Sequence, residues 1–180
     1  SLRMLAADPP DVDGARETAR RTIRDGNRAS EVIVKLRALF MKREATTEPL
    51  DLNDALREVI ALSSSELQRN RVMLRQDLAE DLPPVNGDRV QLQQVILNLL
   101  LNASDAMSDI NDRPRQLVVS TARHDGDLIQ VAVRDVGVGL APGNTEKLFE
   151  PFYTTKSGGM GIGLSVSRSI VERHRGSLWA

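Results

Sequence analysis

The sequence contains no cysteine and very few aromatic residues, and both shortages narrow its chemistry. Without cysteine there is no disulfide framework, no thiolate metal site and no cysteine nucleophile, and a reducing cytosol is compatible with the chain. The aromatic residues are one Trp, one Tyr and three Phe, whereas 41% of the residues are hydrophobic. The core must therefore be mostly aliphatic, and thiol chemistry is excluded.

The chain also lacks an excess of either charge and any long apolar run. It has 24 Lys and Arg against 25 Asp and Glu, a net charge of -1 that disfavours a dedicated binder of nucleic acid or anionic membrane. The longest aliphatic stretch, Val95–Leu101, contains Asn98 and is far shorter than the about 20 residues of a membrane helix. We expect no nucleic-acid partner and no membrane segment in this chain, and we expect it to be part of a longer protein.

The first quarter of the chain has the pattern of a bundle helix. From about Asp13 to about Arg43 no proline interrupts a stripe of apolar residues spaced by three and four. Leu2–Leu5 could end an antiparallel partner helix, which would make a helical hairpin cut short. A homodimeric four-helix bundle is favoured, and a solvated spacer helix is the alternative.

Beyond a polar break at Thr46–Pro49, predicted as a hinge, helices and strands are mixed. The pattern predicts helices from a cap at Asn53 to Asn70, from Asp88 to Met107 and from Ile162 to His174. The second should be largely buried. Strands are predicted over Val72–Leu78, Leu117–Ala122 and Leu128–Val133, the last two paired antiparallel through Asp125-Gly126, with a further strand beginning at Ser177–Ala180 and loops over Leu82–Gly87 and Gly137–Gly163.

Three polar side chains interrupt the apolar helix over Asp88–Met107. Asn98 and Asn102 lie four residues apart, hence on one face, and Asp105 follows one turn later. Amide oxygens in this arrangement can hold a hard cation such as Mg2+, while waters and phosphates complete its ligand shell. An amide that only caps or bridges neighbouring backbone is the alternative for either asparagine.

Two glycine-rich segments follow this helix. In the first, Asp135-Val136-Gly137-Val138-Gly139, a carboxylate at a strand end can accept a hydrogen bond from an exocyclic amine such as that of adenine, and the glycines let a flat ligand approach. An ordinary Asp-Gly turn is the alternative. In the second, Lys156–Leu164, glycine N–H groups at the start of a helix and the Lys156 charge can meet phosphate oxygens. It matches neither the dinucleotide fingerprint nor the P-loop, and a flexible linker is the alternative.

In this order, the segments resemble the motifs of sensor histidine kinases. Gln94–Met107 resembles the N box, Asp135–Gly139 the G1 box, Leu148–Thr154 the F box and Gly159–Leu164 the G2 box. The resemblance spans Pro49–Ala180, and the helix before it resembles the second helix of the family's dimerisation and phosphotransfer hairpin. The short lid, Phe152–Lys156, is most similar to kinases of the nitrogen-regulation and oxygen-sensing type.

The resemblance implies an α+β fold: a two-layer α/β sandwich of the histidine-kinase and chaperone ATPase type, with a mixed sheet under helices, preceded by a long bundle helix. Residues 1–45 would be the partial hairpin, and residues 46–180 the catalytic ATP-binding domain with a truncated C-terminal strand. ATP and Mg2+ would lie between the helical layer and the lid. The implied ATP-binding residues are Asn98, Asn102, Asp105, Asp135, Gly137, Gly139, Thr154, Thr155, Lys156, Gly159, Gly161, Gly163 and Leu164.

Among these, the resemblance implies that Asn102 ligates Mg2+ and that Asp135 receives the adenine amine. Lys156 and the last glycines would lie along the phosphates, with Asn98 near them. Kinases of this family move the γ-phosphate of ATP to a histidine on the first hairpin helix and then to an aspartate of a response regulator. His124 and His174 stand in no such context, so we expect a solvated structural role for both and a phosphoacceptor upstream of Ser1.

The implied partners are a second copy of the chain, through the hairpin, and a response regulator receiver domain, in the cytoplasm, with a parent protein that could be membrane-anchored. One alternative function is a chaperone-type ATPase, in which a glutamate four residues before the metal-binding asparagine acts as general base. That position is Asn98 here, an amide without useful basicity. The other alternative is a nucleotide-binding or dimerisation module without turnover.

Overall fold

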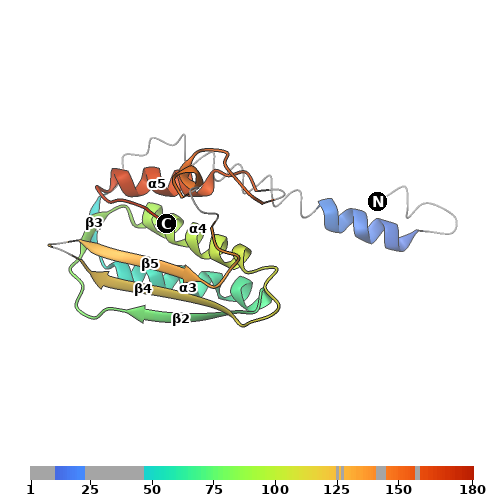
Figure 1. Cartoon of the computed structure of the whole chain (residues 1–180), viewed down its shortest axis with the longest axis horizontal. Helices are drawn as coiled ribbons and strands as arrows, with labels where there is room; N and C mark the ends of the chain where they lie inside the picture. The colour runs from blue at the N-terminus through green and yellow to red at the C-terminus, as the bar shows by residue number, and fades with distance from the viewer. Residues whose placement is uncertain (1–10, 23–46, 125, 127, 141–144, 157–158) are drawn as a thin grey trace. The chain divides into compact units, whose positions relative to one another are not determined.

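The computed structural model describes residues 11–22, 47–124, 126, 128–140, 145–156 and 159–180. The chain divides into two units, Ser1–Lys42 and Arg43–Ala180. In the first unit residues 12–22 are helical (Figure 1, blue), and Asp11 Oδ1 accepts from Gly14 N at 2.8 Å in its first turn. This confirms the start of the predicted Asp13–Arg43 helix. Its remainder and the Leu2–Leu5 partner helix lie outside the described residues.

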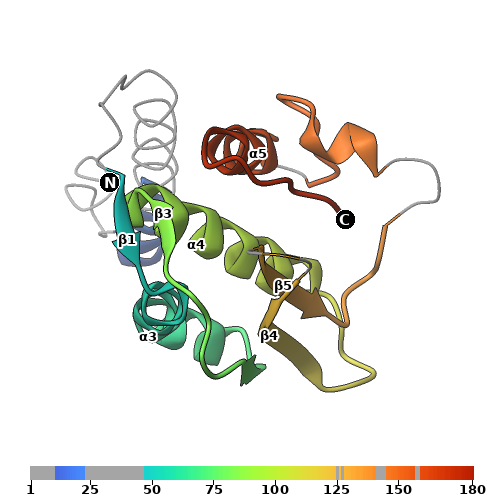
Figure 2. The same ribbon diagram turned by 90° about the vertical axis from the view of Figure 1, so that its left-hand side faces the viewer.

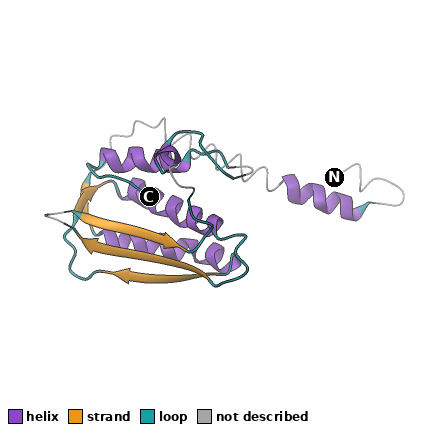
Figure 3. Ribbon diagram, in the orientation of Figure 1, coloured by secondary structure: helices purple, strands orange, loops and turns teal. Residues whose placement is uncertain are grey.

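The second unit is a mixed α+β domain, as predicted. A three-stranded sheet has the order β2-β4-β5, with β2 parallel and β5 antiparallel to β4, and β1 and β3 form a separate antiparallel pair (Figure 3). The parallel pair is joined by a crossover that contains α4, as parallel pairing requires. In chain order the elements are β1 (Glu48–Leu50), α3 (Leu52–Arg69), β2 (Val72–Leu78), β3 (Val85–Gly87), α4 (Arg89–Ala106), β4 (Arg115–Arg123), β5 (Ile129–Asp135), the 3-10 helix η1 (Glu146–Phe149) and α5 (Gly163–Arg173).

Helix α4 lies between two apolar contacts. On one side it packs with α3 on the sheet, and on another it packs against α5 (Figure 2). Leu100 and Met107 are completely buried in the larger cluster, which is aliphatic apart from methionine. The prediction of a largely buried helix holds only in part, because Val90 and Leu97 are exposed. In the part of the chain that the structure describes, no helix is both long and apolar enough to span a bilayer.

A buried polar network joins α3 to the sheet. Asn53 Nδ2 donates to the Ala79 carbonyl at 2.9 Å, and Thr121 Oγ1 donates to Asn53 Oδ1 at 2.9 Å. Thr121 Oγ1 also accepts from Ala79 N at 3.0 Å. The cap predicted at Asn53 is wrong: Asp51 is the N-cap, and its carboxylate accepts from the N–H groups of Asn53 and Asp54. Asn53 is free for the network because Asp51 already satisfies the helix end.

Three further predictions about this domain are corrected. Glu48–Leu50, placed partly in a hinge, is strand β1, and it pairs with Val85–Gly87, which was predicted as loop. Both strands are three residues long and gain their order from this pairing. No strand forms over Ser177–Ala180, where Trp179 is 60% exposed, since β-propensity without a ladder does not offset the entropy of ordering the chain.

His174 is structural, but it is half-buried rather than solvated. Its Nε2 accepts from Asp88 N at 2.9 Å, and its Nδ1 lies 2.7 Å from the Ile170 carbonyl. Both bonds form together when the ring is neutral with its proton on Nδ1. His174 therefore ties the end of α5 to the start of α4, whereas His124 is exposed.

An exposed contact also joins α3 and α4. Glu58 accepts from Arg89 Nη2 at 2.7 Å and from Gln93 Nε2 at 2.6 Å. These bonds, that of Arg89 first, lower the pKa of Glu58, and the bond to Glu58 raises the pKa of Arg89. Because the pKa of Glu58 is lower in the folded than in the unfolded state, its ionisation stabilises the fold at pH values above the unfolded-state pKa. This stabilisation is lost as the pH falls through the folded-state pKa.

Removing the amide of Asn53 tests the buried network. We expect Asn53→Ala to lower the free energy of unfolding by about 2 kcal/mol, because the Ala79 carbonyl loses its donor and Thr121 its acceptor inside the core. Urea unfolding followed by circular dichroism measures the change. Asn86→Ala, on an exposed strand position, is the matched control and should cost under about 0.5 kcal/mol. Equal losses for the two variants would contradict the assignment.

Candidate functional site

The last two turns of α4 carry a cluster of oxygens that already holds a positive charge. Lys156, from the segment before α5, places Nζ 2.8 Å from Asp105 Oδ2 and 3.4 Å from Asn102 Oδ1. The Lys156 and Asp105 side chains are 41% and 57% exposed, so the pair adds little to stability. Its significance is chemical: these oxygens are arranged so that a cation can sit among them.

This donor set fits a magnesium ion that brings its own ligands. In the described ranges no three His, Cys, Asp or Glu side chains gather closely enough to hold a metal. An ion at this place would depend on the Asn102 oxygen, the neighbouring Asp105, water and phosphate oxygens. Mg2+ binds in such sites because it prefers oxygen ligands and dehydrates reluctantly.

Asn98 lies one turn before this cluster and contacts α5 instead. Its Nδ2 donates to Ser167 Oγ at 2.9 Å, and Ser167 is only 1% exposed. Its Oδ1 lies where a Cβ added to Gly163 would collide with it. Asn98 therefore holds the N-terminal half of α5 against α4, through a side-chain hydroxyl rather than through the neighbouring backbone that the alternative supposed.

The segment after β5 is fixed to the end of α4. Asp135 Oδ1 accepts from Gly137 N at 2.8 Å, and Val138 N donates to the Ala106 carbonyl at 3.3 Å. A Cβ on Gly137 would lie 2.6 Å from that carbonyl, so only glycine allows this approach. Among the described residues no donor meets the second carboxylate oxygen of exposed Asp135, which leaves an acceptor open beside a glycine turn.

The segment just before the lid packs onto α5 through the 3-10 helix η1. The guanidinium carbon of Arg168, on α5, lies 5.0 Å from the ring centre of buried Phe149, and Arg168 Nη1 lies 3.2 Å from Glu146 Oε2. Gly161 has φ of +64°, its carbonyl accepts from Phe152 N at 2.9 Å, and a side chain there would collide with the Tyr153 carbonyl. Arg168 and Gly161 thus hold both sides of the lid near the start of α5.

The other predicted site residues, among them the lid candidates Thr154 and Thr155, have local roles or none that the structure shows. Thr154 Oγ1 accepts from Lys156 N at 3.1 Å, and Gly159 lies so near Thr154 that an added Cβ would be 2.8 Å from Oγ1. Thr155 is exposed and Leu164 is half-buried. Gly139 has φ of +75° in open space.

The structure thus brings the predicted residues together in three places around α4. One is the cluster of Asn102, Asp105 and Lys156, another is Asn98 with Gly163, and the third is the Asp135–Gly139 loop. The third adjoins the first because the Ala106 carbonyl accepts from Val138 N, and Ala106 directly follows Asp105. Together they form a candidate site with an open carboxylate at one end and the cluster of Asn102, Asp105 and Lys156 at the other.

Sequence reasoning missed two residues that organise this site. Ser167 stands one turn after Gly163, and that spacing together with Asn98 is a signal that could have found it. Arg113 donates to the carbonyls of Val136 and Gly137, and the sequence of its loop contains no motif from which this contact could be predicted.

A hollow of about 210 Å3 lies beside the loop after α4. It is not lined by the candidate site residues. Arg115 in its wall donates to the carbonyls of Ile110, Asn70 and Ser108, so this arginine is occupied in holding the loop. The hollow is lined by Arg71, Ile110, Asn111, Arg113, Pro114 and Arg115.

Comparison with known proteins gives a family match over residues 87–180. The matching family is described as histidine kinase-, DNA gyrase B- and HSP90-like ATPase. The matched range includes α4, β4, β5, η1 and α5, and hence every predicted site residue. It covers just over half of the 180 residues.

Relatives and a solved structure agree with this match. The chain is 34% identical over 99% of its length to sensor histidine kinase TmoS of Ectopseudomonas mendocina and 38% identical over 100% to sensor protein FixL of Bradyrhizobium diazoefficiens. It spans only 18% of the first and 35% of the second. A nucleotide-free catalytic domain of histidine kinase ThkA matches 73% of this chain and 82% of its own, with 30% identity and a TM-score of 0.61.

The contact between Asn98 and Gly163 can be tested without any ligand. Gly163→Ala adds a good helix former, yet we expect it to cost about 1–2 kcal/mol, because the new Cβ meets Asn98 Oδ1 in a packed contact. Urea unfolding gives the change in free energy. In an Asn98→Ala background the same substitution should be neutral or stabilising. An equal cost in both backgrounds would show that the collision is not the cause.

Proposed function

Because the chain belongs to the histidine kinase-, DNA gyrase B- and HSP90-like ATPase family, we propose that it acts as the catalytic ATP-binding part of a sensor histidine kinase. It binds ATP with Mg2+ and transfers the γ-phosphate to a histidine outside this chain, for relay to an aspartate of a response regulator. The observation that carries the proposal is that the end of α4 carries the Asn102 and Asp105 oxygens and also anchors the loop that presents the open Asp135 carboxylate.

Each part of the site has one task in this proposal. Asp135 accepts a hydrogen bond from the adenine amine, while the Gly137 turn keeps the surface beside it flat. Asn102 presents its amide oxygen to the magnesium ion, and Lys156 leaves Asp105 for the phosphate oxygens. The N–H groups at Gly161 and Gly163 face the phosphates at the start of α5. A bound magnesium ion neutralises phosphate charge, which is the main electrostatic requirement of phosphoryl transfer.

The chemistry at Asn98 supports transfer to a protein acceptor rather than to water. A hydrolase of this family would need a general base one turn before Asn102. Asn98 is an amide, and its Nδ2 already donates a hydrogen bond to Ser167 Oγ at 2.9 Å. It has no basicity with which to activate water, so ATP hydrolysis by this chain should be slow.

The names of two relatives, a sensor histidine kinase and a sensor protein, support the assembly that we propose. Residues 1–45 would be part of a dimerisation and phosphotransfer hairpin, through which the parent protein forms a homodimer. The same hairpin would present its histidine to this domain and to the receiver domain of a response regulator. The domain would work in the cytoplasm, with residues 46–180 as the ATP-binding unit.

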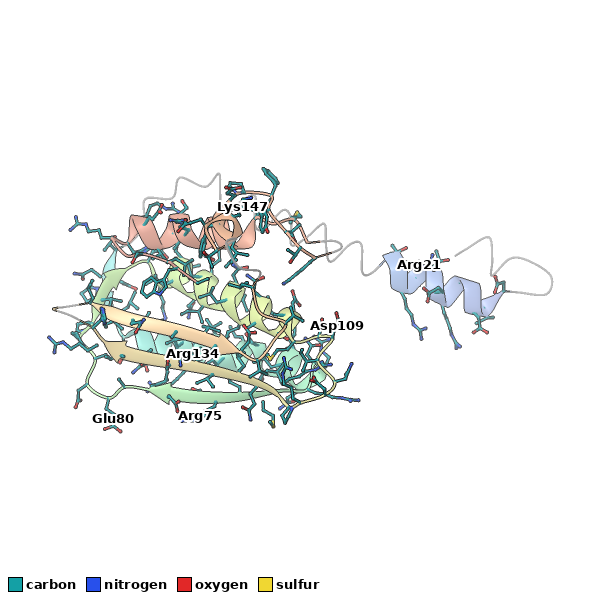
Figure 4. All side chains as sticks on the ribbon, in the orientation of Figure 1. Arg21, Arg75, Glu80, Asp109, Arg134 and Lys147 are labelled. Atoms are coloured by element: carbon teal, nitrogen blue, oxygen red, sulfur yellow. The ribbon has the colours of Figure 1, made fainter. Side chains whose placement is uncertain are left out.

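Asp135→Asn tests the nucleotide site directly. The substitution replaces a charged acceptor, and a hydrogen bond to a charged group is worth about 1.5–3 kcal/mol, so binding of MgADP should weaken about 10- to 150-fold. Calorimetric titration with and without Mg2+ measures it. Asp109→Asn is the matched control: Asp109 is exposed beyond the end of α4 (Figure 4), and its loss should leave affinity unchanged. No binding by the folded wild-type chain would refute the proposal.

Phosphoryl transfer can be tested by supplying the missing acceptor. The chain is mixed with γ-labelled ATP, Mg2+ and a separately purified histidine-bearing hairpin of a sensor histidine kinase. We expect acid-labile, alkali-stable label on the hairpin, and a rate at least about tenfold lower for Asn102→Ala because the magnesium ion loses a ligand. Label that persists when the hairpin histidine is replaced by alanine would count against histidine phosphorylation.

A further inference from the structure

We propose that Arg113 is a positioning residue for base recognition: its guanidinium fixes the loop after β5, and that loop orients the Asp135 carboxylate. Arg113 lies between α4 and β4, outside every segment considered above for binding. Val136 O accepts from its Nε at 3.2 Å and from its Nη2 at 2.9 Å, and Gly137 O accepts from Nη2 at 3.2 Å. One planar side chain thus holds two successive carbonyls.

The opposite ends of the same two peptides are held as well. The Val136–Gly137 peptide offers its carbonyl to Arg113 and its N–H to Asp135 Oδ1 at 2.8 Å. The next peptide offers the Gly137 carbonyl to Arg113 and the Val138 N–H to the Ala106 carbonyl at 3.3 Å. A trans peptide is a rigid plane whose C=O and N–H point in opposite directions. Fixing each carbonyl therefore fixes where the N–H on the other side points.

This geometry makes Arg113 act on Asp135 through the backbone. With the Gly137 N–H aimed at Oδ1, one carboxylate oxygen is engaged and the carboxylate plane is set, which leaves the second oxygen for a ligand donor. A lysine cannot reproduce the arrangement, because a single ammonium lacks the flat fork that spans two carbonyls. The exposed pair with Asp112, at 3.3 Å, adds little to stability and does not account for this placement.

The role in base recognition rests on the proposed function, but the clamp itself can be tested on the nucleotide-free chain. In Arg113→Met we expect the Gly137 amide to exchange with solvent about 3- to 10-fold faster by NMR, since its acceptor is no longer aligned. Arg113→Lys should recover only part of the protection. Arg75→Met, which removes an arginine 73% exposed and paired with Asp77 on β2 (Figure 4), is the control and should change nothing at Gly137. Unchanged exchange in Arg113→Met would overturn the clamp.

Calorimetry then separates base positioning from general binding. Arg113→Met should weaken MgADP about 3- to 10-fold and leave Mg-pyrophosphate, which has no base, unaffected. In an Asp135→Asn background the same substitution should cause no further loss, because it acts through that carboxylate. A loss that is equal for pyrophosphate, or additive with Asp135→Asn, overturns the inference. If the wild type binds no MgADP while Gly137 exchange still depends on Arg113, the clamp stands and the proposed function, with the base-recognition role, fails.

Discussion

The burial of α4 is the constraint on which the other features of the domain depend. Ile96, Leu100 and Met107 recur on the side of the helix that faces the sheet, while Val95 belongs to the contact with α5. Outside these two apolar faces, on a surface that also exposes Val90 and Leu97, the helix carries a strip of polar groups. Asn98, Asn102 and Asp105 occupy that strip, so the same periodicity that builds the core also places the site residues in a row.

The sequence predicted the elements that carry a strong local pattern and missed those that exist only through a partner. Strand β2 and the antiparallel pairing of β4 with β5 are confirmed, because their alternation and turn residues are local signals. Strands β1 and β3 were missed because three residues containing proline or glycine have no pattern of their own. The helix start was misplaced by two residues because Asp51 and Asn53 are both good caps, and only the buried partner Thr121 distinguishes them.

The candidate site divides in the same way. Short motifs identified the segments, since an amide pair on a helix or a glycine turn is visible within a few residues. The bonds that assemble the segments join residues far apart: 51 positions separate Lys156 from Asp105, and 69 separate Asn98 from Ser167. Nothing local to Asp105 predicts its contact with Lys156, and Ser167 could be inferred only once Asn98 and Gly163 were known to face each other. Arg113 is the extreme case, because it donates to backbone carbonyls. Every residue has a backbone carbonyl, so no sequence motif identifies the partners of Arg113.

The ion pair of Lys156 with Asp105 lets the candidate site change its charged partners without leaving either side chain unpaired. In the structure the ammonium of Lys156 lies 2.8 Å from the Asp105 carboxylate and balances its charge. On the proposed function, a magnesium nucleotide brings a cation for Asn102 and Asp105 and an anion for the lysine in the same event. Binding therefore replaces one favourable pair with two, and neither charge is left uncompensated.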